Sequence, residues 1–95
     1  MERQINSEIQ NAVANAYNYS KGNTAVIVKN GTVGVLLHGN VIYKRRGSKE
    51  MFTLAGFETT VTKNRLRAIG IELESKNGQT YYKGEVIDKN KWYEK

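Results

Sequence analysis

The sequence predicts an α+β fold, in which an N-terminal helix packs on an antiparallel meander sheet of five to six strands, with a short inserted helix. Apolar residues recur at helical spacing near the N-terminus, and short β-branched runs separated by glycine and asparagine turns follow them. These turns are too short for the crossover that parallel strands require, so we expect antiparallel pairing. A chain of 95 residues is long enough for one core, and we expect a single domain over residues 1–95. A small closed barrel with a peripheral helix is the alternative architecture.

Residues 1–19 are expected to form the N-terminal helix. Their apolar side chains share one helical face, and the alanines favour a helix; these residues are Ile5, Ile9, Ala12, Val13 and Ala16. An apolar stripe needs a surface to cover it, which is either the sheet of the same chain or the same helix of a second chain in a homodimer. The polar segment around Gly22 is expected to end the helix and serve as a linker.

Residues 23–56 are predicted to form a four-stranded meander. The expected strands are 24–29, 32–38, 41–46 and 50–55. Asn30-Gly31 is a strong hairpin signal, and Gly39 with Asn40 is expected to supply the positive φ angles of the second turn. His38 is interpreted as a turn residue whose imidazole hydrogen-bonds to backbone. Gly56 is interpreted as the turn that ends the meander.

Residues 60–70 are predicted to form the short helix, and residues 71–93 a C-terminal hairpin. The hydroxyls of the threonines at 59–62 can cap the start of the helix, and Gly70 ends it. The helical period predicts that Leu66 is buried and Arg67 exposed. The hairpin is expected to turn at Asn77-Gly78.

Positive charge is concentrated in the middle of the chain. Of a formal net charge of +6, residues 44–67 contribute +5, with seven basic residues against two acidic ones. Every arginine except Arg3 also lies in this segment, whereas residues 68–95 are neutral overall. Arginine suits bidentate contacts with phosphate or carboxylate, so the segregation favours a polyanion or an acidic protein as the partner. A solvated basic face that keeps the protein in solution is the alternative.

The candidate binding residues are six of the seven basic residues of this segment, all but Arg45, together with one threonine at the start of the short helix. They are Lys44, Arg46, Lys49, Thr62, Lys63, Arg65 and Arg67. Alternation along the third strand places Lys44 and Arg46 on one face and Arg45 on the other. Cations near the start of a helix gain nothing from the helix dipole, which suggests that they contact an anion outside the helix.

A structural role for the short helix is the alternative interpretation of the same residues. In that case the threonines only cap the helix, and Arg65 forms one buried ion pair with Glu50 or Glu58.

The composition argues against an enzyme. The chain has no cysteine and one histidine, which excludes thiolate and two-histidine metal sites and leaves no partner for a histidine relay. We therefore expect no catalytic residue, no metal and no cofactor. No apolar run approaches the ~20 residues of a membrane span, and the first residues are too polar for a signal peptide. We expect a soluble, intracellular protein without a membrane partner.

Several motifs resemble a family of small bacteriophage proteins of uncharacterised activity. The motifs are Leu37-His38-Gly39-Asn40-Val41-Ile42, Leu54-Ala55-Gly56-Phe57, the segment from Thr59 to Ile69, and the C-terminal Gly78, Tyr81, Gly84 and Trp92-Tyr93. The resemblance covers most of residues 23–93. This chain departs from the pattern at Phe57, where the family usually has tryptophan, at Lys63-Asn64, where it has arginine and serine, and at Arg67, where it has asparagine. The resemblance implies a phage origin, and hence the host cytoplasm, without implying an activity.

Two function classes are consistent with these observations. The first is a small basic phage accessory protein that binds DNA or RNA, with arginines on phosphates and exposed aromatic side chains stacking on bases. The alternative is a phage factor that captures or inhibits a host enzyme or defence complex by binding its acidic surface.

Overall fold

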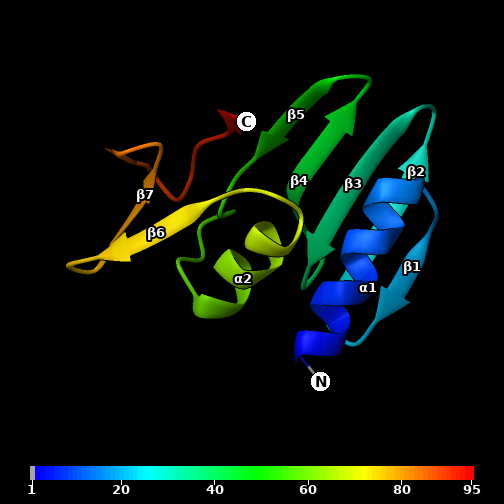
Figure 1. The fold of residues 1–95 in the computed structure, drawn as a ribbon, viewed down its shortest axis with the longest axis horizontal. Helices are drawn as coiled ribbons and strands as arrows, with labels where there is room; N and C mark the ends of the chain where they lie inside the picture. The colour runs from blue at the N-terminus through cyan, green and yellow to red at the C-terminus, as the bar shows by residue number, and fades with distance from the viewer. Residues whose placement is uncertain (1) are drawn as a thin grey trace.

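The computed structural model describes residues 2–95 and confirms the predicted α+β fold (Figure 1). Its elements, in chain order, are α1 (Glu2–Asn15), β1 (Tyr19–Lys21), β2 (Thr24–Lys29), β3 (Thr32–Leu37), β4 (Asn40–Arg46), β5 (Lys49–Phe52), α2 (Thr60–Ala68), β6 (Leu73–Lys76), β7 (Gln79–Tyr82), β8 (Glu85–Val86) and β9 (Tyr93–Glu94). Neither helix in this part of the chain is long and apolar enough to cross a membrane.

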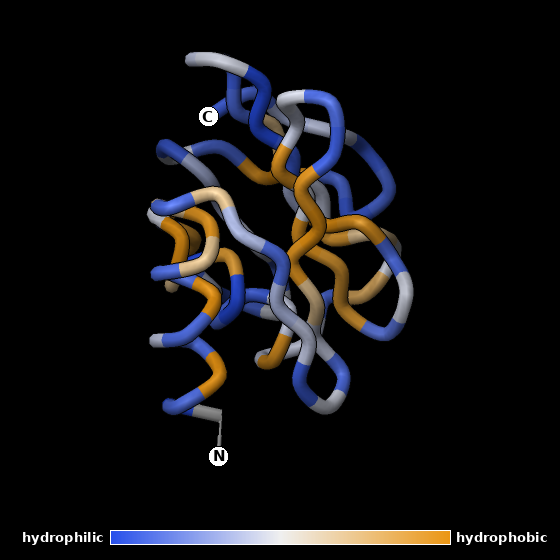
Figure 2. The backbone as a smooth tube through the Cα atoms, turned by 90° about the vertical axis from the view of Figure 1, so that its right-hand side faces the viewer, coloured by the Kyte–Doolittle hydropathy of each residue, from blue (hydrophilic) through white to orange (hydrophobic). Residues whose placement is uncertain are grey.

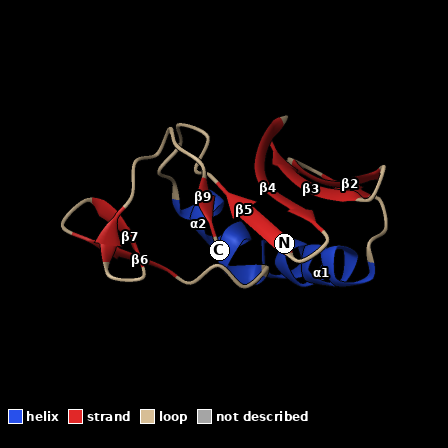
Figure 3. Cartoon of the chain, turned by 90° about the horizontal axis from the view of Figure 1, so that it is seen from above, coloured by secondary structure: helices blue, strands red, loops and turns tan. Residues whose placement is uncertain are grey.

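The main sheet has six strands in the order β1-β2-β3-β4-β5-β9. Strands β1 to β5 form an antiparallel meander, and β9 returns from the C-terminus to pair antiparallel with β5 through Phe52 and Tyr93. The segment expected as a C-terminal hairpin instead forms a separate three-stranded sheet, β6-β7-β8, before the chain reaches β9. This small sheet lies beyond the β5 side of the main sheet (Figure 3).

Both helices lie on the same face of the main sheet (Figure 3). Ile5, Ile9, Ala12 and Val13 of the predicted stripe are buried, and Figure 2 shows the hydrophobic side of the helix turned toward the rest of the chain. The helix ends at Asn15 and not at residue 19, so Ala16, at φ 52°, is exposed outside it. Leu66 of α2 is also fully buried, whereas Arg67 is exposed, as the helical period predicts. The stripe of α1 is therefore covered within one chain, and the opposite face of the main sheet has no helix over it.

Two local predictions about the first half of the chain are wrong. The segment expected as a linker contains strand β1, because a two-residue turn at Gly22-Asn23, with Gly22 at φ 59°, folds it back onto β2. The second hairpin turn uses His38 and Gly39, at φ 52° and 79°, rather than Gly39 and Asn40. A tight hairpin of this kind needs two consecutive residues with positive φ, so β3 ends at Leu37 and β4 begins at Asn40.

The backbone of His38, not its imidazole, holds this turn. The His38 amide donates to the carbonyl of Asn23 at 2.8 Å, and the Asn40 side-chain amide donates to the carbonyl of His38 at 3.4 Å. Within residues 2–95 the imidazole itself makes no hydrogen bond. Gly56 has the expected turn conformation, at φ 84° beside Ala55 at φ 53°.

A β-bulge sets the direction of the basic side chains on β4. Leu36 pairs with Val41 and Val35 with Tyr43, so Ile42 is an extra residue and both Ile42 and Tyr43 are buried. Alternation then resumes toward Arg46. Lys44 and Arg46 consequently share one face, as predicted, and this is the face without helices. Arg45 lies on the helix face, where it donates to the Val13 carbonyl at 2.9 Å.

We predict that the free energy of unfolding falls as the pH rises above 10. Burial and a hydrogen bond to Glu8 raise the pKa of Tyr19 to about 12. Burial and a 2.6 Å hydrogen bond to Glu50 also raise the pKa of Tyr43. The folded state holds both phenol protons more tightly than the unfolded state, which stabilises the fold. This contribution is complete below the ordinary tyrosine pKa of 10.0 and is lost as the pH rises toward the raised pKa values of the folded state. Urea titrations across this range should show the loss, and Tyr43→Phe should reduce its slope. A slope that is unchanged in Tyr43→Phe would contradict the assignment.

Candidate functional site

The face of the main sheet without helices, here called the open face, is organised in three cross-strand rows. The first row runs across four strands as Lys29, Thr32, Arg46 and Lys49. The second row is Ile27, Gly34, Lys44, Met51 and Glu94, and the third is Ser20, Ala25, Leu36 and Val41. Neighbouring strands lie about 4.8 Å apart, so the first row places three cations within roughly 15 Å.

The cations of the open face are exposed and have no acidic partner among residues 2–95. Lys29, Lys44, Arg46 and Lys49 are all exposed, and none forms an ion pair with a described carboxylate. Arg46 and Lys49 are direct cross-strand neighbours, a placement that costs stability when both side chains carry the same charge. This end of the sheet therefore presents uncompensated positive charge.

Apolar and aromatic side chains lie beside these cations. Ile27, Val41 and Trp92 keep 47%, 37% and 38% of their surface exposed. The Lys44 ammonium lies 4.4 Å from the centre of the Trp92 ring, which places the indole on the open face next to the charged row. The open face thus combines cations with surface that favours contact with flat or apolar groups.

The structure divides the predicted binding residues between two faces. Lys44, Arg46 and Lys49 lie on the open face, whereas Thr62, Lys63, Arg65 and Arg67 lie on α2, on the helix face. The two basic clusters therefore do not form one surface.

Arg65 is a structural residue in the core. Its side chain is 0% exposed, and it donates from Nε to Thr24 Oγ1 at 2.9 Å and from Nη1 to Asn6 Oδ1 at 2.7 Å. A third bond reaches Asn23 Oδ1 at 3.3 Å. The alternative interpretation correctly has Arg65 buried, but its ion pair with Glu50 or Glu58 is wrong, since the hydrogen bonds go to Thr24, Asn6 and Asn23.

The two carboxylates named for that pairing have other partners. Glu50 accepts from the Tyr43 hydroxyl and pairs with Lys95 at 3.5 Å, and Glu58 accepts from Thr80 at 2.8 Å.

The remaining residues of α2 hold the helix and the small sheet in place. Thr59 is the N-cap, and its Oγ1 accepts from the Thr62 amide at 3.2 Å, while Thr62 itself is buried. Lys63 donates to Ser75 Oγ at 2.8 Å, and Arg67 donates to the Leu73 carbonyl at 3.0 Å. Thr62 and Arg65 are therefore corrected from binding residues to structural ones, since both side chains are buried and hydrogen-bonded within the fold.

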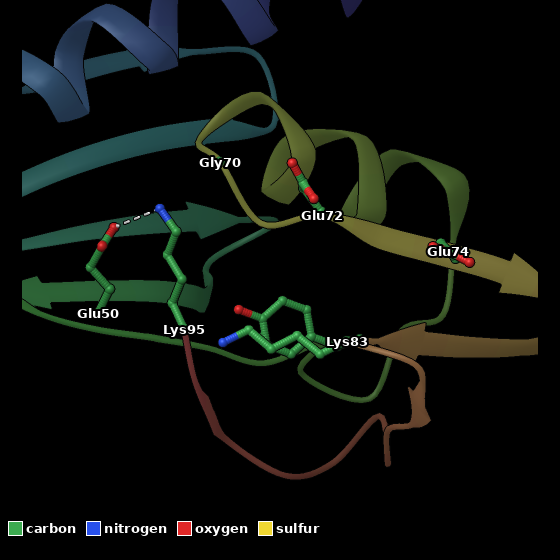
Figure 4. Close-up of a pocket in the computed structure, with 7 residues that line it drawn as sticks. Glu50, Gly70, Glu72, Glu74, Lys83 and Lys95 are labelled. Atoms are coloured by element: carbon green, nitrogen blue, oxygen red, sulfur yellow. Dashed lines mark ion pairs between the residues drawn. The ribbon is translucent and has the colours of Figure 1, made fainter.

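A groove of about 530 Å³ separates α2 and β6 from the C-terminal strand (Figure 4). Its charged lining consists of Glu50, Glu72, Glu74, Lys83 and Lys95. Glu50 is paired with Lys95, and the Lys83 ammonium lies 5.2 Å from the centre of the Tyr82 ring. With three carboxylates against two ammonium groups, this groove is unfavourable for a phosphate chain, unlike the open face.

Within residues 2–95 no three His, Asp or Glu side chains are placed to hold a metal ion.

The open face was only partly predictable from the sequence. Lys29 lies in a segment without other cations, and Trp92 reaches Lys44 only because β9 pairs with β5. Nothing in the local sequence around either residue indicated the open face.

Comparison with known proteins identifies one relationship. The family model for the Kyanoviridae Gp96 protein matches residues 2–95. The match includes α1, which lies outside the resemblance over residues 23–93. No curated protein and no solved structure matches the chain.

We predict that Arg65→Lys destabilises the fold by about 1.5–3 kcal/mol, because lysine keeps the charge but cannot reproduce the forked hydrogen bonds to Thr24 and Asn6. The matched control is Arg46→Lys on the open face, which should change the free energy of unfolding by less than about 0.5 kcal/mol. Urea unfolding of both variants measures the difference. Equal effects would contradict the structural role of Arg65.

Proposed function

This chain belongs to the Kyanoviridae Gp96 family, a phage protein family, and we propose that it is a non-enzymatic accessory protein that binds nucleic acid. The binding surface in this proposal is the open face, with the first row and Lys44 as its cations. Its place of action is the host cytoplasm.

The observation that carries the proposal is the unpaired positive charge of the first row. Strand pairing holds Arg46 and Lys49 side by side and places Lys29 in the same row on the far side of Thr32, and none of the three has an acidic partner among the described residues. Such an arrangement costs stability in the isolated protein, and an anionic chain that neutralises it releases its own counterions on binding. A phosphate backbone on the open face would neutralise these side chains, which supports the proposal.

The apolar side chains next to the cations favour a single strand over a duplex. Bases are available for stacking only when they are unpaired, and exposed aromatic side chains beside cations are the usual platform for them. Trp92 supplies the aromatic ring, and Ile27 and Val41 supply apolar surface for base and sugar. The proposed ligand is therefore single-stranded DNA or RNA.

A protein partner with an acidic surface, such as a host enzyme or defence complex, is the second candidate. The apolar third row, with Leu36 and the exposed Val41, supports it, because protein interfaces place an apolar centre inside a charged rim. The two candidates differ in their dependence on salt.

We predict that binding to a single strand weakens linearly with the logarithm of salt concentration. Three to four phosphate contacts give a slope of roughly −2 to −3, and Arg46→Gln or Lys49→Gln should each flatten it by about 0.7. Lys76→Gln and Lys89→Gln, which remove exposed lysines from the neutral C-terminal segment, are the matched controls and should leave the slope unchanged. Fluorescence anisotropy over a salt series measures these slopes.

Three results of that series would count against the proposal. Equal losses in both pairs of variants would show that net charge alone is responsible. If the protein instead binds an acidic host protein, and that binding depends only weakly on salt concentration, the second candidate is favoured. The absence of binding to DNA and RNA at ~50 mM salt would remove nucleic acid altogether.

A further inference from the structure

A pocket of about 340 Å³ lies between the β3–β4 turn and the start of α2, at the opposite end of β4 from Arg46. It is lined by Leu37, His38, Asn40, Ile42, Leu54, Phe57, Thr59, Val61 and Thr62. Its volume is within the range of small-ligand sites, and five of its nine lining residues are apolar. The pocket is distinct from the open face, because Leu37, Ile42 and Leu54 are buried on the helix side of the sheet and the start of α2 completes the lining.

The walls of the pocket are fixed by backbone hydrogen bonds in the surrounding turns. The Phe57 amide donates to the Leu54 carbonyl at 2.9 Å, and the Gly56 amide donates to the Lys89 carbonyl at 2.8 Å. Leu54 and Ile42 are each only 1% exposed, whereas Phe57 keeps 53% of its surface exposed at the edge of the pocket. A large ring that is so exposed on a rigid turn is available for stacking.

The polar lining falls into two groups. Thr59 and Thr62 are used by the fold, since their hydroxyls lie 2.9 Å apart and Thr59 caps α2. The His38 imidazole and the side-chain carbonyl of Asn40 have no hydrogen-bond partner within residues 2–95. No charged side chain lines the pocket. The fitting ligand is therefore an uncharged ring with an edge that forms hydrogen bonds, and not a phosphate or a carboxylate.

We infer that this pocket binds a nucleobase, which stacks on Phe57 and turns its hydrogen-bonding edge to Asn40 and His38. Adenine fits this arrangement, because an asparagine side chain can pair with its N6 and N7 atoms. The base comes either from a free nucleoside or from a strand lying on the open face. The second source rests on the proposed function and extends it: the length of β4 places the pocket roughly 20 Å from the first row along the strand, and the bound strand then passes the β3–β4 turn to reach the helix face.

The test compares an adenine-only single strand with the same strand carrying one abasic position, for the wild type and three variants. Removing the base should weaken wild-type binding about 5- to 150-fold, the range for one stacked base. Phe57→Ala should weaken binding of the intact strand by a similar factor and make the abasic position neutral. Phe57→Trp should restore the wild-type behaviour. Tyr17→Ala is the matched control, since Tyr17 is 45% exposed but does not line the pocket.

A second arm titrates free adenosine and follows the NMR signals of the Phe57 ring and the Asn40 amide. Shifts of both groups in the wild type, together with an unshifted Asn40 amide in Phe57→Ala, support the pocket. If no strand binds at the same time, only the proposed function is overturned. A normal salt slope with no effect of Phe57→Ala in either arm overturns the pocket and leaves the proposed function standing. If an acidic peptide with an aromatic residue shifts the Phe57 and Asn40 signals and adenosine does not, the inference is overturned in favour of a protein ligand.

Discussion

The hydrogen bonds of the buried Arg65 guanidinium determine which face of the main sheet is covered. This one side chain joins α2 to Asn6 on α1 and to Thr24 on β2, so both helices are held on the same face. A charge removed from water is tolerated only when its donors are satisfied, and its placement therefore fixes the helices closely. Because residues 2–95 contain no helix besides α1 and α2, the opposite face stays open.

The one-sided cover also sorts the charges of the chain. Two basic residues of α2, Lys63 and Arg67, donate to Ser75 and Leu73 of β6 and so contribute to the structure. The cations of β2, β4 and β5 face away from the helices and have no acidic partner among the described residues. The folded chain therefore has one basic face and one groove that is lined by both acidic and basic side chains.

Features governed by neighbouring residues could be predicted from the sequence. The stripe of α1, the meander, the burial of Leu66 and the alternation at Lys44 and Arg46 all follow from local spacing, and the structure agrees. Features set by distant contacts could not. Arg65 bonds to a residue 59 positions away, and nothing near it in sequence marks it as buried rather than as a phosphate contact. The same limit applies to Trp92, which joins the site only through the pairing of β9 with β5.

The most direct test of the account is an NMR titration of the whole chain with a single-stranded oligonucleotide, in which both backbone amides and side chains are followed. We expect the largest shifts at Ile27, at the residues of the first row and at the Trp92 indole, with little change along α1 or in the groove at Glu72. Shifts confined to the helix face or to the groove would contradict the claim that the open face is the binding surface.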